Sequence, residues 1–281
     1  MTMFTFADTT TMPFDELPTN PGLKFQLLWK DPPTGSTVQM SYGPPGFSST
    51  IVEMLSHGPH RHYHRNVHER HYILGGDYPI WHWPNDRDEG TMTILRRHTF
   101  LENPAKTLHG LRPETTPEIA TQLLVWNNGS GTGIFEKDAE KETVEVPLDG
   151  PPRSDVEWAS PRILSTKDLI WRQHPSIEGW KIKDVAGAEQ DCPPVVLVSI
   201  PPGATARAAP DLRGADRRWF FVLSGDLSLI VETSDGTSQL SLQEGHFLAW
   251  PDDTRLTYPA GAMSDGGCVS LCVGHDLASQ T

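Results

Sequence analysis

The sequence lacks the features of several large protein classes. Its 281 residues contain 23 Lys and Arg against 36 Asp and Glu, a formal net charge of −13. Such a surface repels phosphate, so we expect neither a nucleic-acid partner nor an anionic membrane. No apolar run approaches the roughly 20 residues that a transmembrane helix needs. The first eight residues show no basic segment followed by a long apolar one, so we expect no secretory signal and a cytoplasmic protein.

Cysteine is also scarce, with only Cys192, Cys268 and Cys272 in the chain. An odd and sparse set argues against a fold held by disulfides and agrees with a reducing compartment. The last two cysteines alternate with Val and Leu residues, so we interpret them as strand residues that pack in a core.

Long helix-period patterns are absent, whereas short β-type runs between turn residues are frequent. Gly and Pro contribute 24 and 25 residues, which makes the chain rich in turns. The runs expected to form strands include 37–42, 71–74, 122–126, 195–200, 219–223, 227–232, 246–250 and 269–273. Strands at this spacing, bounded by Gly, Pro, Asn and Asp, predict an all-β sandwich or barrel.

The two halves of the chain resemble each other. Matching segments occur in the same order, with drifting loop lengths: 28–30 with 170–172, 44–46 with 201–203, 72–77 with 221–226, and 100–104 with 247–251. This order predicts a duplicated β-domain. An acidic, proline-containing stretch separates the copies, so the predicted division is an arm at 1–20, a domain at 21–135, a linker at 136–157 and a domain at 158–281.

Histidines are concentrated in one part of the first half. Nine of the twelve fall between His57 and His109, which marks this segment as the place for chemistry. Successive side chains of a strand point to opposite faces, so His62 and His64 face the same way and their imidazoles can reach one metal ion. Glu69 begins the next β-type run and would add a carboxylate from the neighbouring strand.

Two imidazoles and a carboxylate suit Fe, Mn, Ni, Co or Zn, and the ligand types alone do not choose among them. Forty residues beyond Glu69, His109 offers a fourth ligand after a proline turn. His71 shares a face with Glu69, so it either lines a cavity as a catalytic candidate beside Glu69 or is a hydrogen-bonded interior histidine.

The spacing of these residues resembles that of a known family. His62, one residue, His64, four residues, Glu69, six residues and Gly76 reproduce the first signature motif of the cupins. Pro104, followed after four residues by His109, resembles the second motif. The resemblance implies double-stranded β-helix (jelly-roll) barrels, with His62, His64, Glu69 and His109 as the metal ligands. Together with the repeat, it implies a bicupin that covers roughly residues 20–275, with two such barrels in tandem.

The match has departures. His98 stands where the second motif opens with Gly, and Lys106 stands where a Gly follows the proline by two residues. Neither is a ligand position. In the second half, Arg218 and Leu256 fall where the carboxylate and the last histidine ligand stand in the first half. Neither side chain replaces a carboxylate or an imidazole as a ligand, so we expect a degenerate, metal-free second cupin.

Four further residues are candidates for the wall of a substrate pocket: Trp81, Trp83, His98 and Phe100. The tryptophans would share one face of a strand while His82 takes the other. A tryptophan pair is more often a core feature than a substrate platform, so both interpretations stay open.

The resemblance implies one divalent transition metal per chain, with Fe(II) favoured and Mn, Ni, Co or Zn as alternatives. Four protein ligands leave open positions for a small-molecule substrate or dioxygen. With Fe(II), we expect a dioxygenase that cleaves a C–C bond of a diketone, an enediol or a phenolic ketone. With the other metals, we expect a Lewis-acid isomerase or lyase. A non-catalytic small-molecule-binding cupin is the competing class, because the barrel hosts many functions. The resemblance also implies a homodimer.

Overall fold

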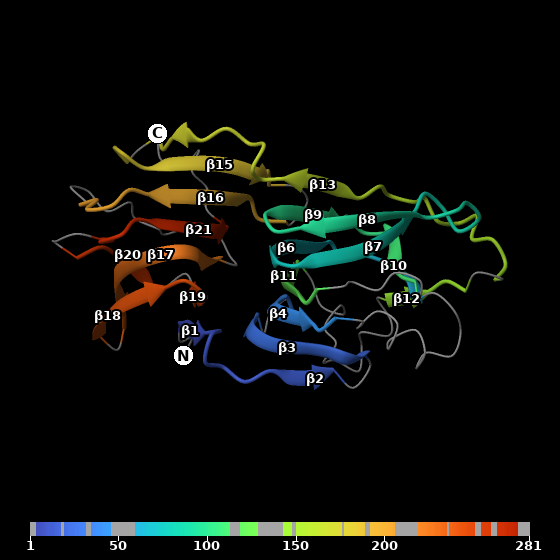
Figure 1. Cartoon of the computed structure of the whole chain (residues 1–281), viewed down its shortest axis with the longest axis horizontal. Helices are drawn as coiled ribbons and strands as arrows, with labels where there is room; N and C mark the ends of the chain where they lie inside the picture. Colours follow the sequence, from blue (N-terminus) through green and yellow to red (C-terminus); the bar gives the residue numbers. More distant parts are fainter. Residues whose placement is uncertain are drawn as a thin grey trace. The chain divides into compact units, whose positions relative to one another are not determined.

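The computed structural model describes residues 4–17, 20–31, 35–45, 60–112, 119–128, 143–147, 150–175, 177–188, 192–205, 218–234, 236–250, 254–259 and 263–274 (Figure 1). These residues form antiparallel β-strands and loops, and the described part of the chain contains no helix. The predicted all-β class is therefore confirmed.

The chain divides into two compact units. Pro13–Thr166 forms one unit, here called the N-terminal barrel, and Met1–Met12 joins Lys167–Thr281 in the other, here called the C-terminal barrel. The described part of the expected linker 136–157 includes β12 (Thr143–Glu145), which pairs with β5 (His60–His64). The expected N-terminal arm includes β1 (Thr5–Asp8), which pairs with β19 (His246–Trp250).

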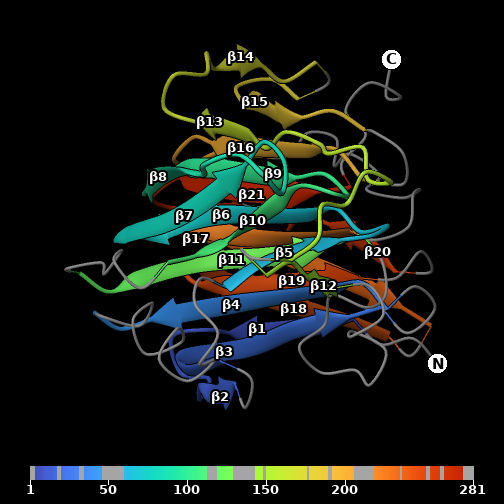
Figure 2. The ribbon, with the colours of Figure 1, turned by 90° about the vertical axis from the view of Figure 1, so that its right-hand side faces the viewer.

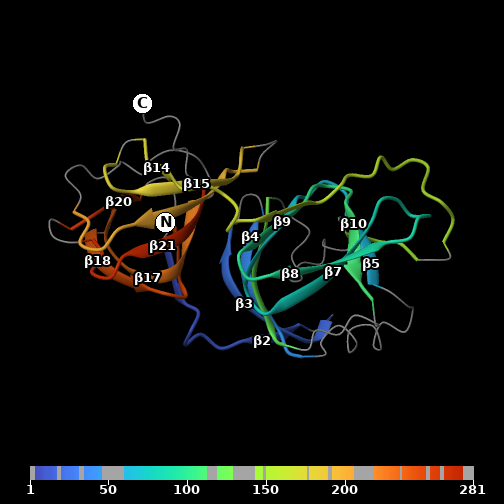
Figure 3. The same ribbon diagram turned by 45° about the horizontal axis from the view of Figure 1, so that its top comes forward.

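The N-terminal barrel consists of two sheets. The larger has the order β13-β9-β6-β11-β4-β3-β2 and the smaller the order β12-β5-β10-β7-β8. Figure 2 shows β2, β3 and β4 side by side, and Figure 3 shows β3, β4 and β9 on one side of this barrel, with β5, β7, β8 and β10 on the other. The remaining strands are β2 (Asp15–Leu17), β3 (Asn20–Lys30), β4 (Thr37–Gly43), β6 (Glu69–Gly75), β7 (Asp77–Trp83), β8 (Thr91–Arg96), β9 (Thr99–Asn103), β10 (Leu108–Leu111), β11 (Thr121–Asn127) and β13 (Arg162–Ser165).

The C-terminal barrel repeats this plan. Its sheet has the order β1-β19-β17-β21-β16-β15-β14, with β18 and β20 paired to the second half of β17. Position for position, this path matches the larger sheet of the N-terminal barrel. Its other strands are β14 (Arg172–Gln173), β15 (Lys181–Ala186), β16 (Val195–Ile200), β17 (Arg218–Thr233), β18 (Gly236–Gln243), β20 (Arg255–Thr257) and β21 (Cys268–Val273).

The first strand of each repeat pairs with the other repeat. β1 precedes the strands of the N-terminal barrel in sequence, yet it pairs with β19 of the C-terminal barrel. β13 comes directly before the strands β14 to β21 of the C-terminal barrel in sequence, yet it pairs with β9 of the N-terminal barrel. The two exchanges are reciprocal, so each barrel is completed by a strand from the other repeat.

The predicted strands lie within the observed ones, with one difference of continuity. The runs 219–223 and 227–232 belong to a single strand, β17. A register shift between Val222 and Ser224 and a φ of +81° at Gly225 change its direction, so it leaves β19 and β21 and continues against β18. The glycine that looked like the end of a strand is a bend within it.

The glycine of the first motif is required by a close backbone approach. Gly76 has a φ of +72°, and a Cβ there would lie 1.8 Å from the carbonyl oxygen of Ala120. Gly225 has a φ of +81°, and a Cβ there would lie 1.8 Å from the carbonyl oxygen of Gly267. The two glycines therefore have the same role in the two barrels.

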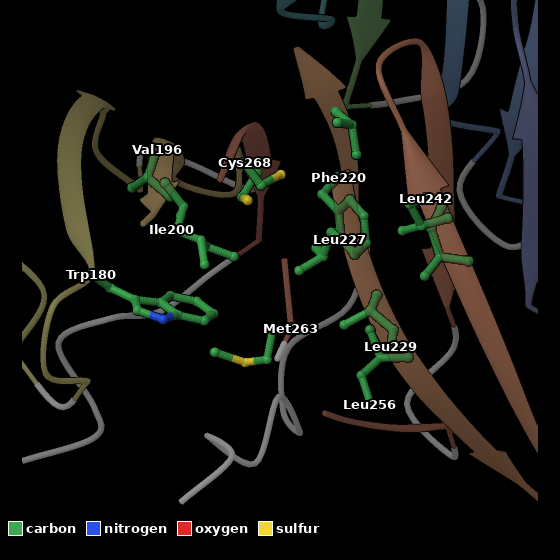
Figure 4. Packing of buried hydrophobic residues seen from close by; sticks show 14 of the residues in the cluster. Trp180, Val196, Ile200, Phe220, Leu227, Leu229, Leu242, Leu256, Met263 and Cys268 are labelled. Carbon is green, nitrogen blue, oxygen red and sulfur yellow. The ribbon is translucent and has the colours of Figure 1, made fainter. Parts of the chain in front are cut away.

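The interior of the C-terminal barrel is apolar (Figure 4). Trp180, Phe220, Leu229, Leu256 and Met263 belong to one buried cluster, and Leu256 is fully buried within it. Leu256 is the residue that the repeat aligns with His109, so hydrophobic packing fills this barrel at the position where the other barrel carries an imidazole.

Candidate metal centre

Two neighbouring strands of the smaller sheet bring the predicted histidine ligands together. His109 on β10 lies opposite His62 on β5 in the strand register, and His64 lies two residues further along β5 on the same face. One ligand atom from each of the three residues lies within 4.8 Å of the other two. The ring centroid of His62 is 4.4 Å from that of His109 and 5.2 Å from that of His64.

The carboxylate comes from the larger sheet, at the start of β6. Oε2 of Glu69 lies 3.3 Å from Nε2 of His109, and Oε1 lies 3.9 Å from Nε2 of His64. Nε2 of His71, two residues along the same strand, lies 3.0 Å from Oε2 of Glu69. The structure therefore brings His71 and the four predicted ligands into one cluster.

Hydrogen bonds fix the orientation of two imidazoles. Nδ1 of His109 lies 2.9 Å from the carbonyl oxygen of Thr107, and Nδ1 of His64 lies 3.1 Å from the hydroxyl of Thr143. Metal-ligating histidines share this arrangement, in which the second ring nitrogen is held by a protein group. It leaves Nε2 of each ring directed toward Glu69.

The contact between His109 and Glu69 tests whether a cation fits. A carbonyl oxygen only accepts hydrogen bonds, so Nδ1 of His109 carries the proton and the neutral ring has a lone pair on Nε2. That buried lone pair faces a carboxylate oxygen at 3.3 Å, and two acceptors repel at this distance. A cation at these atoms removes the conflict, so the donor set fits a divalent transition metal.

The Glu69 carboxyl is anionic over the physiological pH range. Burial alone raises its pKa, but the neighbouring His71 and His109 imidazoles outweigh burial, so the pKa lies well below its usual value. The side chain keeps 18% exposure, against 4% for His109 and 5% for His71. The carboxylate is therefore more accessible than the two buried imidazoles beside it.

Sequence reasoning did not assign three residues of this site. The first is His82, which lies opposite His109 in the strand register. The second is Asn103, whose Oδ1 is 3.0 Å from Nε2 of His82. Nδ2 of Asn103 is 3.4 Å from Oε2 of Glu69. Burial and then the charge of His109 lower the pKa of His82 to about 4, so its ring is neutral near pH 7. The third residue is Tyr78, whose ring centroid lies 5.7 Å from that of His71. Strand alternation could have indicated His82, because it places this residue on the face opposite to its tryptophan neighbours.

Tyr78 keeps its hydroxyl proton. Burial and then the Glu69 carboxylate raise its pKa well above the ordinary tyrosine value. A protonated phenol on the side of the cluster next to His71 is a hydrogen-bond donor that a small oxygen-bearing molecule can use.

The predicted tryptophans are not at the site. Trp81 and Trp83 lie opposite Gly110 and Leu108, so they face away from His82 and His109. Trp83 packs with Leu108 in a hydrophobic cluster, and the two indoles are stacked with ring centroids 6.1 Å apart. The tryptophan pair is therefore part of the hydrophobic packing of this barrel.

Phe100 and His98 also lie away from the cluster. Phe100 is paired in register with Tyr72, which alternates with His71 and faces the opposite side of β6. Nδ1 of His98 lies 3.3 Å from the hydroxyl of Tyr72, so His98 belongs to the same side. The register of β9, which the sequence pattern did not reveal, directs Phe100 away from the predicted metal ligands.

The fold is that of the cupin (jelly-roll) proteins, as solved structures show. Oxalate decarboxylase from Bacillus subtilis matches with 13% identity over 96% of this chain and 75% of its own, at a TM-score of 0.59. A putative glyoxylate-induced protein from Pseudomonas aeruginosa matches with 12% identity over 96% and 87%, at 0.62. Protein Ylba from E. coli matches with 11% identity over 97% and 92%, at 0.57. No protein-family model matches the sequence, and no curated protein matches it.

In the described part of the chain, no helix has the length and apolar character needed to cross a bilayer.

Proposed function

We propose that the chain is a mononuclear metal-dependent cupin enzyme, with the ion held by His62, His64, Glu69 and His109. The observation that carries the proposal is the buried contact between Nε2 of His109 and Oε2 of Glu69, which calls for a cation. Three imidazoles and one carboxylate favour a divalent transition metal over Mg or Ca, which prefer oxygen ligands.

The leading reaction is dioxygenolytic C–C cleavage of a small diketone, enediol or phenolic ketone, with Fe(II) as the metal. When bound, an ion with four protein ligands supplies open positions for a chelating substrate and for dioxygen. Among the residues of the chain, Nε2 of His71 lies 3.0 Å from Oε2 of Glu69, so this pair is placed to hold the proton that an enol or phenol gives up. The Tyr78 hydroxyl donates a hydrogen bond to a substrate oxygen.

A second candidate is a metal-dependent lyase that acts on a small carboxylate. The likeness to oxalate decarboxylase, which covers 96% of this chain, favours it. When bound, Mn, Ni, Co or Zn would supply a Lewis acid that polarises a substrate oxygen. Glu69 and His71 would keep their role of holding a proton.

Metal analysis of protein purified without an affinity tag tests the proposal. About one transition-metal ion per chain is expected in the wild type, and a large loss is expected in His62→Ala and His109→Ala. His246→Ala is the matched control, because this histidine belongs to the C-terminal barrel and lies near Asp8. A wild-type protein that takes up no transition metal, or variants that retain it, would contradict the proposed site.

A second experiment distinguishes the dioxygenase from the lyase. Protein loaded with Fe(II) or with Mn(II) is mixed with diketones, phenolic ketones and oxalate, and both O₂ uptake and CO₂ release are recorded. Substrate-dependent O₂ consumption with loss of a C–C bond supports the dioxygenase. CO₂ release without net O₂ consumption supports the lyase.

We also propose that the tandem barrels form a bicupin and that the chain is a homodimer. The matching strand orders and the equivalent glycines Gly76 and Gly225 support the duplication. Light scattering after size-exclusion chromatography is expected to give roughly twice the chain mass of 31.2 kDa.

A further inference from the structure

The strand register sets two asparagines beside the metal-ligating carboxylate. Asn103 on β9 and Asn127 on β11 are both opposite Glu69 on β6, one on each side. Their amides have different partners. The side chain of Asn103 reaches Glu69, whereas the amide of Asn127 binds the backbone N–H and the hydroxyl of Thr37.

Hydrogen-bond chemistry determines the orientation of the Asn103 amide. A carboxylate only accepts, so the amide must direct Nδ2 at Oε2 of Glu69, 3.4 Å away. Oδ1 then faces His82, and its distance of 3.0 Å from Nε2 requires that this nitrogen donate. The three side chains form a chain of donors in one direction, from His82 through Asn103 to Glu69.

Burial makes this chain of hydrogen bonds rigid. Asn103 is 1% exposed and His82 is 8% exposed. Reversing the amide would set two acceptors together at Glu69, and unsatisfied polar groups are costly in a buried site. The three residues come from β6, β7 and β9, so both sheets hold the chain in place.

We infer that Asn103 is a positioning residue that holds the Glu69 carboxylate toward the metal ligands His64 and His109, and that His82 acts on Glu69 only through Asn103. The inference rests on the proposed metal function. Outer hydrogen-bond partners of metal ligands typically contribute about 10–100-fold to metal affinity. Asn103 and His82 therefore set the affinity of the site without contacting the ion.

The test measures the dissociation constant of Mn(II) for the metal-free full chain, from the electron paramagnetic resonance signal of free Mn(II). Asn103→Leu is expected to weaken binding about 10–100-fold. Asn127→Leu is the matched control, because it removes a buried asparagine at the same register level, and its affinity is expected to change by less than about threefold. Circular dichroism establishes that each variant is folded.

Two variants of His82 separate positioning from simple packing. His82→Phe is expected to weaken Mn(II) binding, whereas His82→Gln, whose amide can still donate to Oδ1 of Asn103, is expected to restore much of the affinity. In a double variant, His82→Phe should add little to Asn103→Leu, because the two residues act in series. The two single variants of His82 also test the inference if Asn103→Leu does not fold.

The outcomes distinguish the inference from the proposal beneath it. If the wild type does not bind Mn(II) or any of the other transition metals, the proposed metal function is wrong and this inference is wrong with it. If the wild type binds while Asn103→Leu and His82→Phe bind equally well, the metal site stands and the positioning role is overturned. Additive losses in the double variant would overturn the action of His82 through Asn103.

Discussion

The hydroxyl of Thr9 donates a 2.6 Å hydrogen bond to the carbonyl of Gly245, a residue 236 positions later in the chain. The backbone N–H of Thr9 donates to the same oxygen. In the N-terminal barrel, the N–H and hydroxyl of Thr166 donate in the same way to the carbonyl of His98. Each threonine follows an exchanged strand, β1 or β13, and ties it to the turn before its partner strand.

This symmetry predicts that two conservative variants each loosen a different strand. Thr9→Val should loosen β19 and leave β9 unchanged, whereas Thr166→Val should loosen β9 and leave β19 unchanged. Each lost hydroxyl bond is expected to cost about 1 kcal/mol. Amide hydrogen exchange of the two strands measures the effect, and each variant is the control for the other. Equal protection of β19 in Thr9→Val and the wild type would contradict the role given to this contact.

A second prediction compares adjacent glycines. Gly76→Ala should destabilise the N-terminal barrel by more than about 2 kcal/mol, because a positive φ and a backbone carbonyl at 1.8 Å leave no room for a Cβ. Gly225→Ala should do the same in the C-terminal barrel. Gly75→Ala is the control, since a Cβ there meets nothing within 4 Å, and a change within about 0.5 kcal/mol is expected. Urea denaturation gives the free energies of unfolding, and a Gly76→Ala variant as stable as Gly75→Ala would refute the prediction.

A third prediction concerns Lys106, which has a φ of +68°. A side chain in this conformation costs roughly 1–2 kcal/mol, which the greater backbone entropy of an unfolded glycine offsets only in part. Lys106→Gly is therefore expected to raise the free energy of unfolding by about 0.5–1 kcal/mol. Lys106→Val should lower it, because a β-branched residue tolerates a positive φ poorly. Thermal and urea unfolding of the two variants should move in opposite directions.

A fourth prediction concerns pH. Burial raises the pKa of Cys268 to about 11, and burial followed by the proximity of Cys268 raises that of Cys272 as well. Because the folded barrel holds these thiols protonated, their contribution to stability is complete below the ordinary thiol pKa and is lost as pH rises toward the raised values. The free energy of unfolding should therefore fall between about pH 9 and pH 11.

Comparison with a Cys268→Ala/Cys272→Ala variant isolates the thiols from the other groups that titrate in this range. The difference in pH slope between the two proteins is the measured quantity. Identical slopes would show that the thiols do not carry the effect. Below this range, at pH 8, alkylation of Cys268 and Cys272 in the native wild type should be slow, because little thiolate is present.

The clustering of His62, His64 and Glu69 was predictable because their placement depends on local rules. Alternation on one strand brings His62 and His64 to the same face, and a short turn fixes the distance to Glu69. The predicted pocket residues depend on register, which is set by distant strands. For this reason Phe100, opposite Tyr72, and the tryptophans of β7 face away from the site.

The departures from the cupin motif also acquire a physical explanation. His98 and Lys106 stand where the motif has glycine, and in the described part of the chain they are the two non-glycine residues with a positive φ. The positive φ is kept at both positions although glycine, the residue that favours it, is absent. In the second half, Gly245 stands at the position of His98 and also has a positive φ. The pairing of β1 with β19 could not be predicted, because no local signal identifies a partner more than two hundred residues away.

The reciprocal exchange of first strands sets an order of events during synthesis on the ribosome. The N-terminal barrel has all its strands once residue 166 has emerged, since β13 closes its larger sheet. β1 is made before the strands of the N-terminal barrel, but its partner β19 is made more than two hundred residues later. While the N-terminal barrel assembles, β1 must therefore wait for β19, which is supplied only when the last hundred residues have been synthesised.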